Sequence, residues 1–250
     1  MLDKDTGSRS KDLEFTIIKD DVLMTYKYEL HAHTAEVSKC SRISGVDLVR
    51  FYKNKGYSGL CITDHFFNGN TSVPRNLPWK ERVNLLCVGY ENAFKEGQKL
   101  GIDVFFGWEW SLNGTDILTF GLTKEWLLDH PDILSLSLND YCDLAHESGA
   151  FLAHAHPFRE ASYIDMIRLF PRKVDAVEVL NAERTDFENE RAEEYANNYA
   201  LLKIACSDNH VGKQKRYCGI KTSKRLGSLR EITDVIRKRE IQLFTEYEKR

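Results

Sequence analysis

Short β-like runs alternate with helical stretches along the whole of this 250-residue chain. Repeated strand–helix units imply a parallel sheet covered by helices, and about seven units in a chain of this length fit a closed barrel better than an open doubly wound sheet. The expected strands are 23–33, 59–65, 103–112 continuing into 117–122, 150–156, 174–180, 202–208, 217–222 and 241–245. The expected helices are 45–55, 79–100, 136–148, 163–170, 186–200 and 228–240.

The composition is that of a globular protein, with 42% hydrophobic residues, 29% charged residues and a net charge of -3. We expect one domain over residues 1–250, with its core at about 22–245. No apolar run approaches the ~18 residues of a membrane span, so no membrane contact is expected. Residues 1–12 are charged and unlike a signal peptide, and the six cysteines form no Cys-x-x-Cys pair. We therefore predict reduced thiols and a cytoplasmic location.

The C-terminal end, residues 213–250, carries 12 Lys and Arg against 5 Asp and Glu. An excess of this kind could attract nucleic acid. A solvated helix face at 228–240 is the simpler interpretation, because the chain as a whole is not basic.

Side chains that bind metals fall at the C-terminal ends of five expected strands. In a βα barrel these ends form one rim, which is where active sites are found. Residues i and i+2 of a strand point to the same side about 6.7 Å apart, so a His-x-His pair can converge on one cation. The rim side chains are His31, His33, Asp64, His65, Glu109, His154, His156, Asp208 and His210.

A lone His-x-His pair is weak evidence, because histidine pairs also occur in strands for packing or hydrogen bonding. Here five strands place His, Glu or Asp at one rim. With only 8 histidines in the chain, such a concentration is an unlikely accident of composition, so it favours a metal site. Glu109 and Asp208 would offset the charge of the cations, and Glu109 is suited to bridge two of them. The alternatives are an ion pair for Asp208 and a strand-end cap for Glu109.

These motifs resemble those of the PHP (polymerase and histidinol phosphatase) family of metal-dependent phosphoesterases. The resemblance covers most of the chain, in the family's order and at its usual separations. It implies a distorted seven-stranded (βα)7 barrel, TIM-like, which holds two or three Zn, Mn or Fe ions and hydrolyses phosphate esters. The stretches that carry it are Glu29-Leu-His-Ala-His-Thr34, Ile62-Thr-Asp-His65, Gly107-Trp-Glu109, Ala155-His-Pro-Phe-Arg159, Glu178-Val-Leu-Asn181 and Cys206-Ser-Asp-Asn-His210.

Carried over residue by residue, the resemblance implies up to three cation sites. The third would include His65 and His210, and the second would use Glu109, His156 and one further ligand. The first would be held by His31, His33, Glu109 and Asp208.

The chain departs from the family's pattern at two places. Lys39 and Cys40 stand where the family often has a His or Asp, and Asp116 is interpreted as a replacement for another frequent His. Three interpretations stay open at the first place: Cys40 as a zinc thiolate, Glu36 as a substitute ligand, or Cys40 as a small buried hydrophobe.

The expected chemistry is hydrolysis of a phosphate monoester by a metal-activated hydroxide, because bound cations lower the pKa of water toward about 7. No side-chain nucleophile is needed. Arg159 is placed to grip a phosphate oxygen, with a surface salt bridge as the alternative. Asp64 or His65 could assist proton transfer. His154 shares the strand face of His156 in this interpretation and could line the site behind the ligands.

The expected partner is a small phosphorylated substrate: a compound like histidinol phosphate, a nucleotide, the end of a short nucleic acid, or phosphotyrosine. Two other functions are compatible with the motifs. One is a non-catalytic metal-binding PHP domain, suggested by the residues at 39 and 40. The other is a metallo-amidohydrolase that acts on a C–N bond, although Arg159 favours an anionic substrate. The sequence decides neither the native metal nor the oligomeric state.

Overall fold

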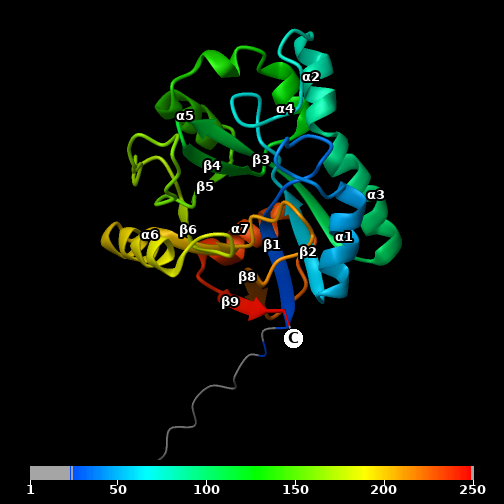
Figure 1. Cartoon of the computed structure of the whole chain (residues 1–250), viewed down its shortest axis with the longest axis vertical. Coiled ribbons are helices and arrows are strands. Elements are labelled where there is room, and N and C mark those ends of the chain that lie inside the picture. The colour runs from blue at the N-terminus through cyan, green and yellow to red at the C-terminus, as the bar shows by residue number, and fades with distance from the viewer. Residues whose placement is uncertain (1–22, 24, 249–250) are drawn as a thin grey trace, which may run out of the picture.

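The computed structural model describes residue 23 and residues 25–248 of the chain. The expectations about residues 1–12, residue 22 and the last two residues lie outside this range. Within it, one sheet contains the strands, and helices pack around it (Figure 1). The strands are β1 (Tyr26–Ala32), β2 (Tyr57–Ile62), β3 (Asp103–Leu112), β4 (Thr115–Phe120), β5 (Phe151–Ala155), β6 (Ala176–Asn181), β7 (Leu202–Cys206), β8 (Arg216–Thr222) and β9 (Gln242–Tyr247). The helices are α1 (Gly45–Asn54), α2 (Trp79–Leu86), α3 (Val88–Leu100), α4 (Lys124–Asp129), η1 (Ile133–Ser135), α5 (Leu138–Glu147), α6 (Asp186–Asn198) and α7 (Leu229–Arg237).

The strands follow the order β7-β6-β5-β4-β3-β2-β1-β8-β9 across the sheet. β1, β2 and β3 are parallel, and so are β5, β6 and β7. β4 lies antiparallel between β3 and β5, and β8 is antiparallel to both β1 and β9. The sheet curls until Asn209, just after β7, meets β1: its carbonyl accepts from the N–H of His33 at 3.0 Å, and its N–H donates to the carbonyl of His31 at 3.4 Å. The result is a nearly closed barrel.

The prediction of a mixed α/β fold with a barrel-like sheet is confirmed, but the described residues form nine strands rather than a (βα)7 barrel. The run expected as one strand over 103–122 is the hairpin β3–β4. Asn113 and Gly114 make its two-residue turn, with φ of 48° and 83°. Asn-Gly favours the turn type that joins antiparallel strands, because both of its residues tolerate positive φ. The last two expected strands are also antiparallel, as β8 and β9.

Five of the six expected helical stretches contain helices. The stretch 79–100 forms two helices, α2 and α3, rather than one. The stretch 163–170 forms none, and Tyr163 and Met166 are exposed there, so a helix would bury no apolar face. The short α4 was not expected; its N-cap is Thr123.

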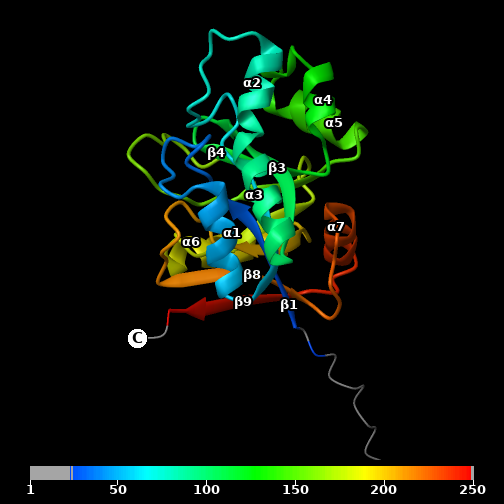
Figure 2. The same ribbon diagram turned by 90° about the vertical axis from the view of Figure 1, so that its right-hand side faces the viewer.

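Three apolar clusters hold helices against the barrel, and the largest of them includes residues of α2, α4, α5 and α6. One joins Phe105, Phe120 and Phe151 to Ile232 and Ile236 of α7. Another packs β2 and β3 against α1 and α3, which lie side by side in Figure 2 with α7 apart from them. Two of the basic residues of the C-terminal end, Arg230 and Arg237, lie on α7, and both are exposed. None of the helices in the described part of the chain has the length and apolar character needed to cross a bilayer.

Glu29 joins β1 to the end of β7, the outermost strand on one side of the curled sheet. Its carboxylate is fully buried and accepts hydrogen bonds from the N–H of His31 at 2.9 Å, the N–H of Ser207 at 3.0 Å and the hydroxyl of Tyr52 at 2.9 Å. Ser207 directly follows β7. A buried carboxylate is tolerated only when donors of this kind surround it. Glu29 therefore connects β1 to β7 where regular strand pairing is absent.

Replacement of Glu29 tests this connection. In Glu29→Ala, the N–H of Ser207 and the hydroxyl of Tyr52 lose a buried acceptor, so we expect the free energy of unfolding to fall by about 3 kcal/mol or more. Urea denaturation in the presence of a chelator measures this loss apart from metal binding. The exposed Glu240→Ala is the control and should stay within about 0.5 kcal/mol of the unchanged protein. A loss in Glu29→Ala as small as that of the control would contradict the proposed connection.

Candidate metal centre

His31 and His33 place two ring nitrogens together at the end of β1. Their Nε2 atoms are 3.0 Å apart, and both side chains are fully buried. Oδ1 of Asp208 lies 3.5 Å from Nε2 of His31 and 3.3 Å from Nε2 of His33. Two ligand atoms of a tetrahedral zinc ion are about 3.3 Å apart, so these three side chains have the spacing of a shared cation site.

Glu109 of β3 lies at the centre of the cluster. Oε1 is 3.4 Å from Nε2 of His31 and 3.2 Å from Nε2 of His156. Oε2 is 3.7 Å from Nε2 of His33 and 2.5 Å from Nδ1 of His65. The two oxygens thus face different pairs of histidines, which is the arrangement expected of a carboxylate that bridges two cations.

Two of the predicted ligands reach the cluster because the backbone turns into the left-handed region. His156 has φ of 27° and Asp208 has φ of 52°, and each stands just after a strand, β5 or β7. A non-glycine residue in this region costs free energy, and such residues concentrate at functional sites. The strain therefore marks the positions where the chain aims side chains at the cluster.

His154 does not line the site, contrary to the sequence-based expectation. Side chains on β5 alternate, and Ala153 and Ala155 pack in the cluster that contains α7. His154 points the other way, with its ring 6.2 Å from Phe170 and 5.9 Å from Tyr195 between centroids, and burial lowers its pKa to about 3. His156 does not follow this alternation: its backbone has a positive φ, and its side chain lies beside Glu109 in the cluster.

A second group of imidazoles stands beside the first. The ring of His33 lies 4.4 Å from that of His65 and 4.2 Å from that of His210, between centroids. Sγ of Cys40 lies 3.1 Å from Nε2 of His65. Burial alone would raise the pKa of Cys40, but hydrogen bonds with His210 and His65 lower it to about 6. With this pKa, Cys40 can lose its proton and form a thiolate near neutral pH.

The donor set fits divalent cations. Four groups of three His, Asp or Glu side chains have ligand atoms within 4.8 Å of one another: His33, His65 and His210; His31, His156 and Glu178; His31, His33 and Asp208; and Glu109, Asp116 and His156. Oε2 of Glu109 and Nδ1 of His65 are buried and lie 2.5 Å apart as an ion pair. Imidazole nitrogens and carboxylate oxygens are the donor types that bind zinc and similar cations.

The charges in the cluster offset one another. Burial would lower the pKa of His31, but Asp208, Glu178 and Glu109 raise it well above its usual range. Burial would raise the pKa of Glu109, but His65 and His31 hold it well below its usual range. A site that favours ionised carboxylates beside imidazoles suits a bound cation, which would take over the role of the imidazole proton.

Glu178 of β6 supports the cluster, although it was not assigned a role from the sequence. Nδ1 of His31 donates to Oε1 of Glu178 at 3.0 Å, and the N–H of His156 donates to Oε2 of Glu178 at 2.8 Å. Glu178 therefore orients Nε2 of His31 toward the cluster, as carboxylates behind metal-binding histidines commonly do. Its signal in the sequence is an acidic residue within the apolar run of β6.

Asp64 and Glu36 turn away from the site. The carboxylate of Asp64 accepts from the N–H and the hydroxyl of Thr34, each at 2.6 Å, and from the hydroxyl of Ser38 at 2.7 Å. These bonds hold the loop after β1 and occupy the carboxylate expected to assist proton transfer. Glu36 accepts from the N–H of Gly45 at 3.1 Å, at the start of α1, so it is not placed as a substitute ligand.

Asp116 and Arg159 lie together at the rim. Oδ2 of Asp116 is 4.0 Å from Nε2 of His156 and 3.1 Å from Nη2 of Arg159. The N–H of Arg159 donates to the carbonyl of His156 at 2.9 Å, which fixes the turn after β5. Arg159 is largely buried, and its Nε has no hydrogen-bonding partner. The ion pair with Asp116 is thus a buried contact beside the cluster rather than a surface salt bridge.

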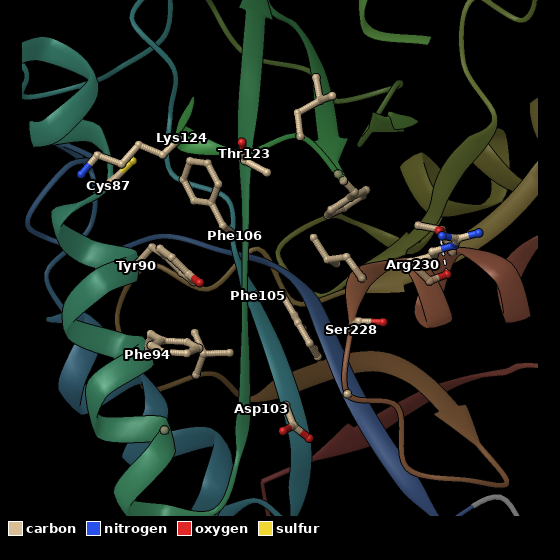
Figure 3. A pocket seen from close by; sticks show the side chains of 18 of the residues that line it. Cys87, Tyr90, Phe94, Asp103, Phe105, Phe106, Thr123, Lys124, Ser228 and Arg230 are labelled. Atoms are coloured by element: carbon tan, nitrogen blue, oxygen red, sulfur yellow. Dashed lines mark hydrogen bonds between the residues drawn. The ribbon is translucent and has the colours of Figure 1, made fainter. Parts of the chain in front are cut away.

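A cavity of about 570 Å³ opens onto this cluster. Glu109, Asp208, His65 and His210 contribute to its walls, with Arg159 also exposed to it. A larger hollow of about 1100 Å³ lies elsewhere, between α3, β3 and the start of α7. Figure 3 shows its aromatic lining, including Tyr90 and Phe94 on α3. None of the clustered ligand candidates lines this larger hollow, whereas His65, Glu109, Asp208 and His210 line the smaller cavity.

The sequence matches the PHP domain over residues 29–243. The chain belongs to the PHP domain family. No curated protein matches it. The PHP match spans every predicted ligand, from His31 to His210, and the resemblance inferred from the motifs is confirmed at the level of the family.

Solved structures agree with the PHP fold. A two-domain protein from Bacteroides vulgatus that contains a predicted PHP-like metal-dependent phosphoesterase has a TM-score of 0.64 and 17% identity, covering 95% of this chain and 69% of that one. PsfC from Pseudomonas syringae has a TM-score of 0.56 and 20% identity, with coverage of 89% and 91%. An amidohydrolase from Chromobacterium violaceum with bound SO4 and no metal has a TM-score of 0.51 and 14% identity, with coverage of 74% and 87%. At these identities the likeness establishes the fold alone.

Replacement of Glu178 tests whether this carboxylate orients the His31 ring toward the cluster. Glu178→Gln keeps the size of the side chain but removes the charge that holds His31, so we expect affinity for zinc to fall by roughly 10- to 100-fold. Competition with a chromophoric chelator measures the affinity. Glu190→Gln, on the exposed face of α6, is the matched control and should bind zinc as the unchanged protein does. Equal affinities for the two variants would show that Glu178 does not orient the ligands.

Proposed function

We propose that this PHP protein is a metal-dependent phosphoesterase that hydrolyses a phosphate monoester. The observation that carries the proposal is the combination in one 570 Å³ cavity of a cation-binding cluster and a largely buried arginine, Arg159. A cluster of this kind supplies electrophilic assistance, and the arginine supplies a planar fork for an oxyanion. We also retain the cytoplasm as the proposed location.

The proposed ligands are the residues predicted from the motifs, with two or three Zn, Mn or Fe ions. Bound divalent ions would supply Lewis acidity and make hydroxide available at neutral pH. Glu109 would hold two ions together, since its two oxygens face different histidines. The proposed ligand residues are His31, His33, His65, Glu109, His156, Asp208 and His210.

Arg159 is proposed to bind a phosphoryl oxygen. Asp116 holds Nη2 of its guanidinium at 3.1 Å, and Nε remains without a partner inside the protein. The aromatic ring of Tyr163 lies 5.7 Å from the guanidinium carbon, on the cavity wall. This contact limits the orientations that the guanidinium can take. Asp116 and Tyr163 thus restrict the orientation of the Arg159 guanidinium in the free protein, which lowers the entropic cost of binding a phosphoryl group.

The cavity suits a small phosphorylated compound. Cavities of 300–1,000 Å³ accommodate small-molecule ligands, and this one falls within that range. A histidinol-phosphate-like molecule, a nucleotide, a phosphotyrosine side chain or the end of a short oligonucleotide all satisfy the requirement for a terminal phosphate.

A metallo-amidohydrolase is the second candidate. The likeness to the Chromobacterium violaceum amidohydrolase favours it, because that fold carries a protein described as a C–N hydrolase. That structure also holds sulfate, a tetrahedral anion like phosphate. Arg159 favours the phosphoesterase, since a neutral amide offers no anionic oxygen for a guanidinium to bind.

Phosphate release separates these functions. We expect protein loaded with zinc or manganese to release inorganic phosphate from at least one member of a panel of histidinol phosphate, nucleoside phosphates, phosphotyrosine and a 5′-phosphorylated oligonucleotide. Arg159→Ala should lower kcat/KM by roughly 10²-fold, and Arg159→Lys should lower it less, because lysine keeps the charge without the fork. Arg172→Ala, at an exposed arginine nearby in sequence, is the control.

The same preparations should be tested for ammonia release from amides and cyclic amides. Ammonia release without phosphate release would replace the phosphoesterase by the amidohydrolase. Metal binding with neither product would support the non-catalytic PHP domain instead.

A further inference from the structure

Cys40 stands on the open side of the imidazole group. It is exposed, whereas the five other cysteines of the chain are buried. It also lines the cavity that holds the cluster, together with His65 and His210. Among the six thiols, Cys40 is therefore the one with access both to solvent and to the proposed ligands.

The backbone around Cys40 is tied to the segments that carry the histidines. The N–H of Lys39 donates to the carbonyl of Asn70 at 2.9 Å. The hydroxyl of Ser41 donates to the carbonyls of His33 at 3.0 Å and His210 at 3.1 Å, and the N–H of Arg42 donates to the carbonyl of His210 at 2.8 Å. Cys40 is thus held by anchors on both sides rather than on a free loop.

The imidazole of His65 is oriented so that its Nε2 faces Cys40. Nδ1 of His65 faces Oε2 of Glu109 at 2.5 Å, and Nε2 faces Sγ of Cys40 at 3.1 Å. His210 uses Nδ1 against the carbonyl of Asp208 at 2.9 Å, which leaves its Nε2 for another partner. Sulfur and nitrogen ligands of one tetrahedral zinc ion are about 3.6 Å apart, so a shift of about 0.5 Å would bring Cys40 and His65 to that spacing.

A second observation also indicates a cation site here. His33, His65 and His210 each offer a ligand atom, and these atoms lie within 4.8 Å of one another. Nδ1 of His65 is occupied by the ion pair with Glu109, so Nε2 is the nitrogen of His65 left for a cation. Cys40 thus stands beside a group of three imidazoles that has the spacing of a cation site.

We propose that Cys40 supplies a sulfur ligand to a cation held by His65 and His210, so that this position selects zinc over harder ions such as manganese. The proposal rests on the metal dependence proposed above. On binding, the Cys40 thiol gives up its proton to solvent, and the sulfur lone pair binds the cation. Sulfur is a soft donor that favours zinc, whereas manganese favours oxygen donors. The thiolate also supplies negative charge beside two neutral imidazoles.

Cobalt(II) provides a readout that does not depend on activity. Cobalt-loaded protein should show the near-ultraviolet charge-transfer absorption of a thiolate–cobalt bond, and Cys40→Ser should lose it. After chelator competition and desalting, Cys40→Ser should retain about one zinc ion fewer per chain. Cys40→Asp should bind a cation at this position again, through a carboxylate oxygen, and should lack the charge-transfer band. Its preference for zinc over manganese should be at least tenfold weaker than that of the unchanged protein.

The buried Cys87→Ala is the matched control, because it removes a thiol that lines the larger hollow and not the cavity of the cluster, so it should keep both the band and the zinc ion. Circular dichroism of every variant establishes that it is folded. A band that persists in Cys40→Ser, or its absence from the unchanged cobalt-loaded protein, would overturn the role of Cys40. If the band is lost as expected but no ester in the panel releases phosphate, the metal role of Cys40 stands and the proposed phosphoesterase function fails.

Discussion

The carboxylate of Glu29 is the contact on which the rest of the centre depends. The sheet does not close by a full ladder between β1 and β7; closure rests on Asn209 and on the hydrogen bonds that Glu29 accepts from both strands. The proposed ligands leave these strands within a few residues of that point. A displacement of β7 relative to β1 would move Asp208 away from His31 and His33. The stability of the barrel and the geometry of the cluster therefore both depend on the contacts that hold β7 to β1, and the Glu29 carboxylate is a buried part of them.

Charge compensation governs the cluster itself. Five buried or partly buried imidazoles from four segments meet the carboxylates of Glu109, Asp208 and Glu178. Each type lowers the cost of burying the other. The arrangement also carries backbone strain, since His156 and Asp208 take positive φ. Strain and buried charge both oppose folding. Bound cations would offset part of this cost, so metal binding should be linked to stability as well as to chemistry.

Much of the site could be predicted from sequence, because strand ends of a parallel barrel converge and the ligand motifs lie at those ends. The fold was predicted less well. Asn113-Gly114 is a hairpin signal, and reading it would have separated β3 from β4. The apolar run of β6 interrupted by Glu178 was likewise a visible signal of a buried, compensated carboxylate.

Other features have no local signal. Regular alternation places His154 and His156 on one face, and only the positive φ of His156 separates them. The side chain of Glu36 could have pointed to the site or to the start of α1, and that choice depends on the position of α1 in the folded chain. The proximity of Cys40 to His65 arises in the same way, from loop anchors formed by residues distant in sequence.

We propose that this PHP domain holds several cations between its clustered histidines and carboxylates. Elemental analysis of tag-free protein measures them, first as purified and again after reconstitution with zinc or manganese and desalting. We expect two or three ions per chain in the reconstituted protein. A content near zero in both preparations would rule out the proposed cation centre, since a cluster that binds no cation could not support the proposed chemistry.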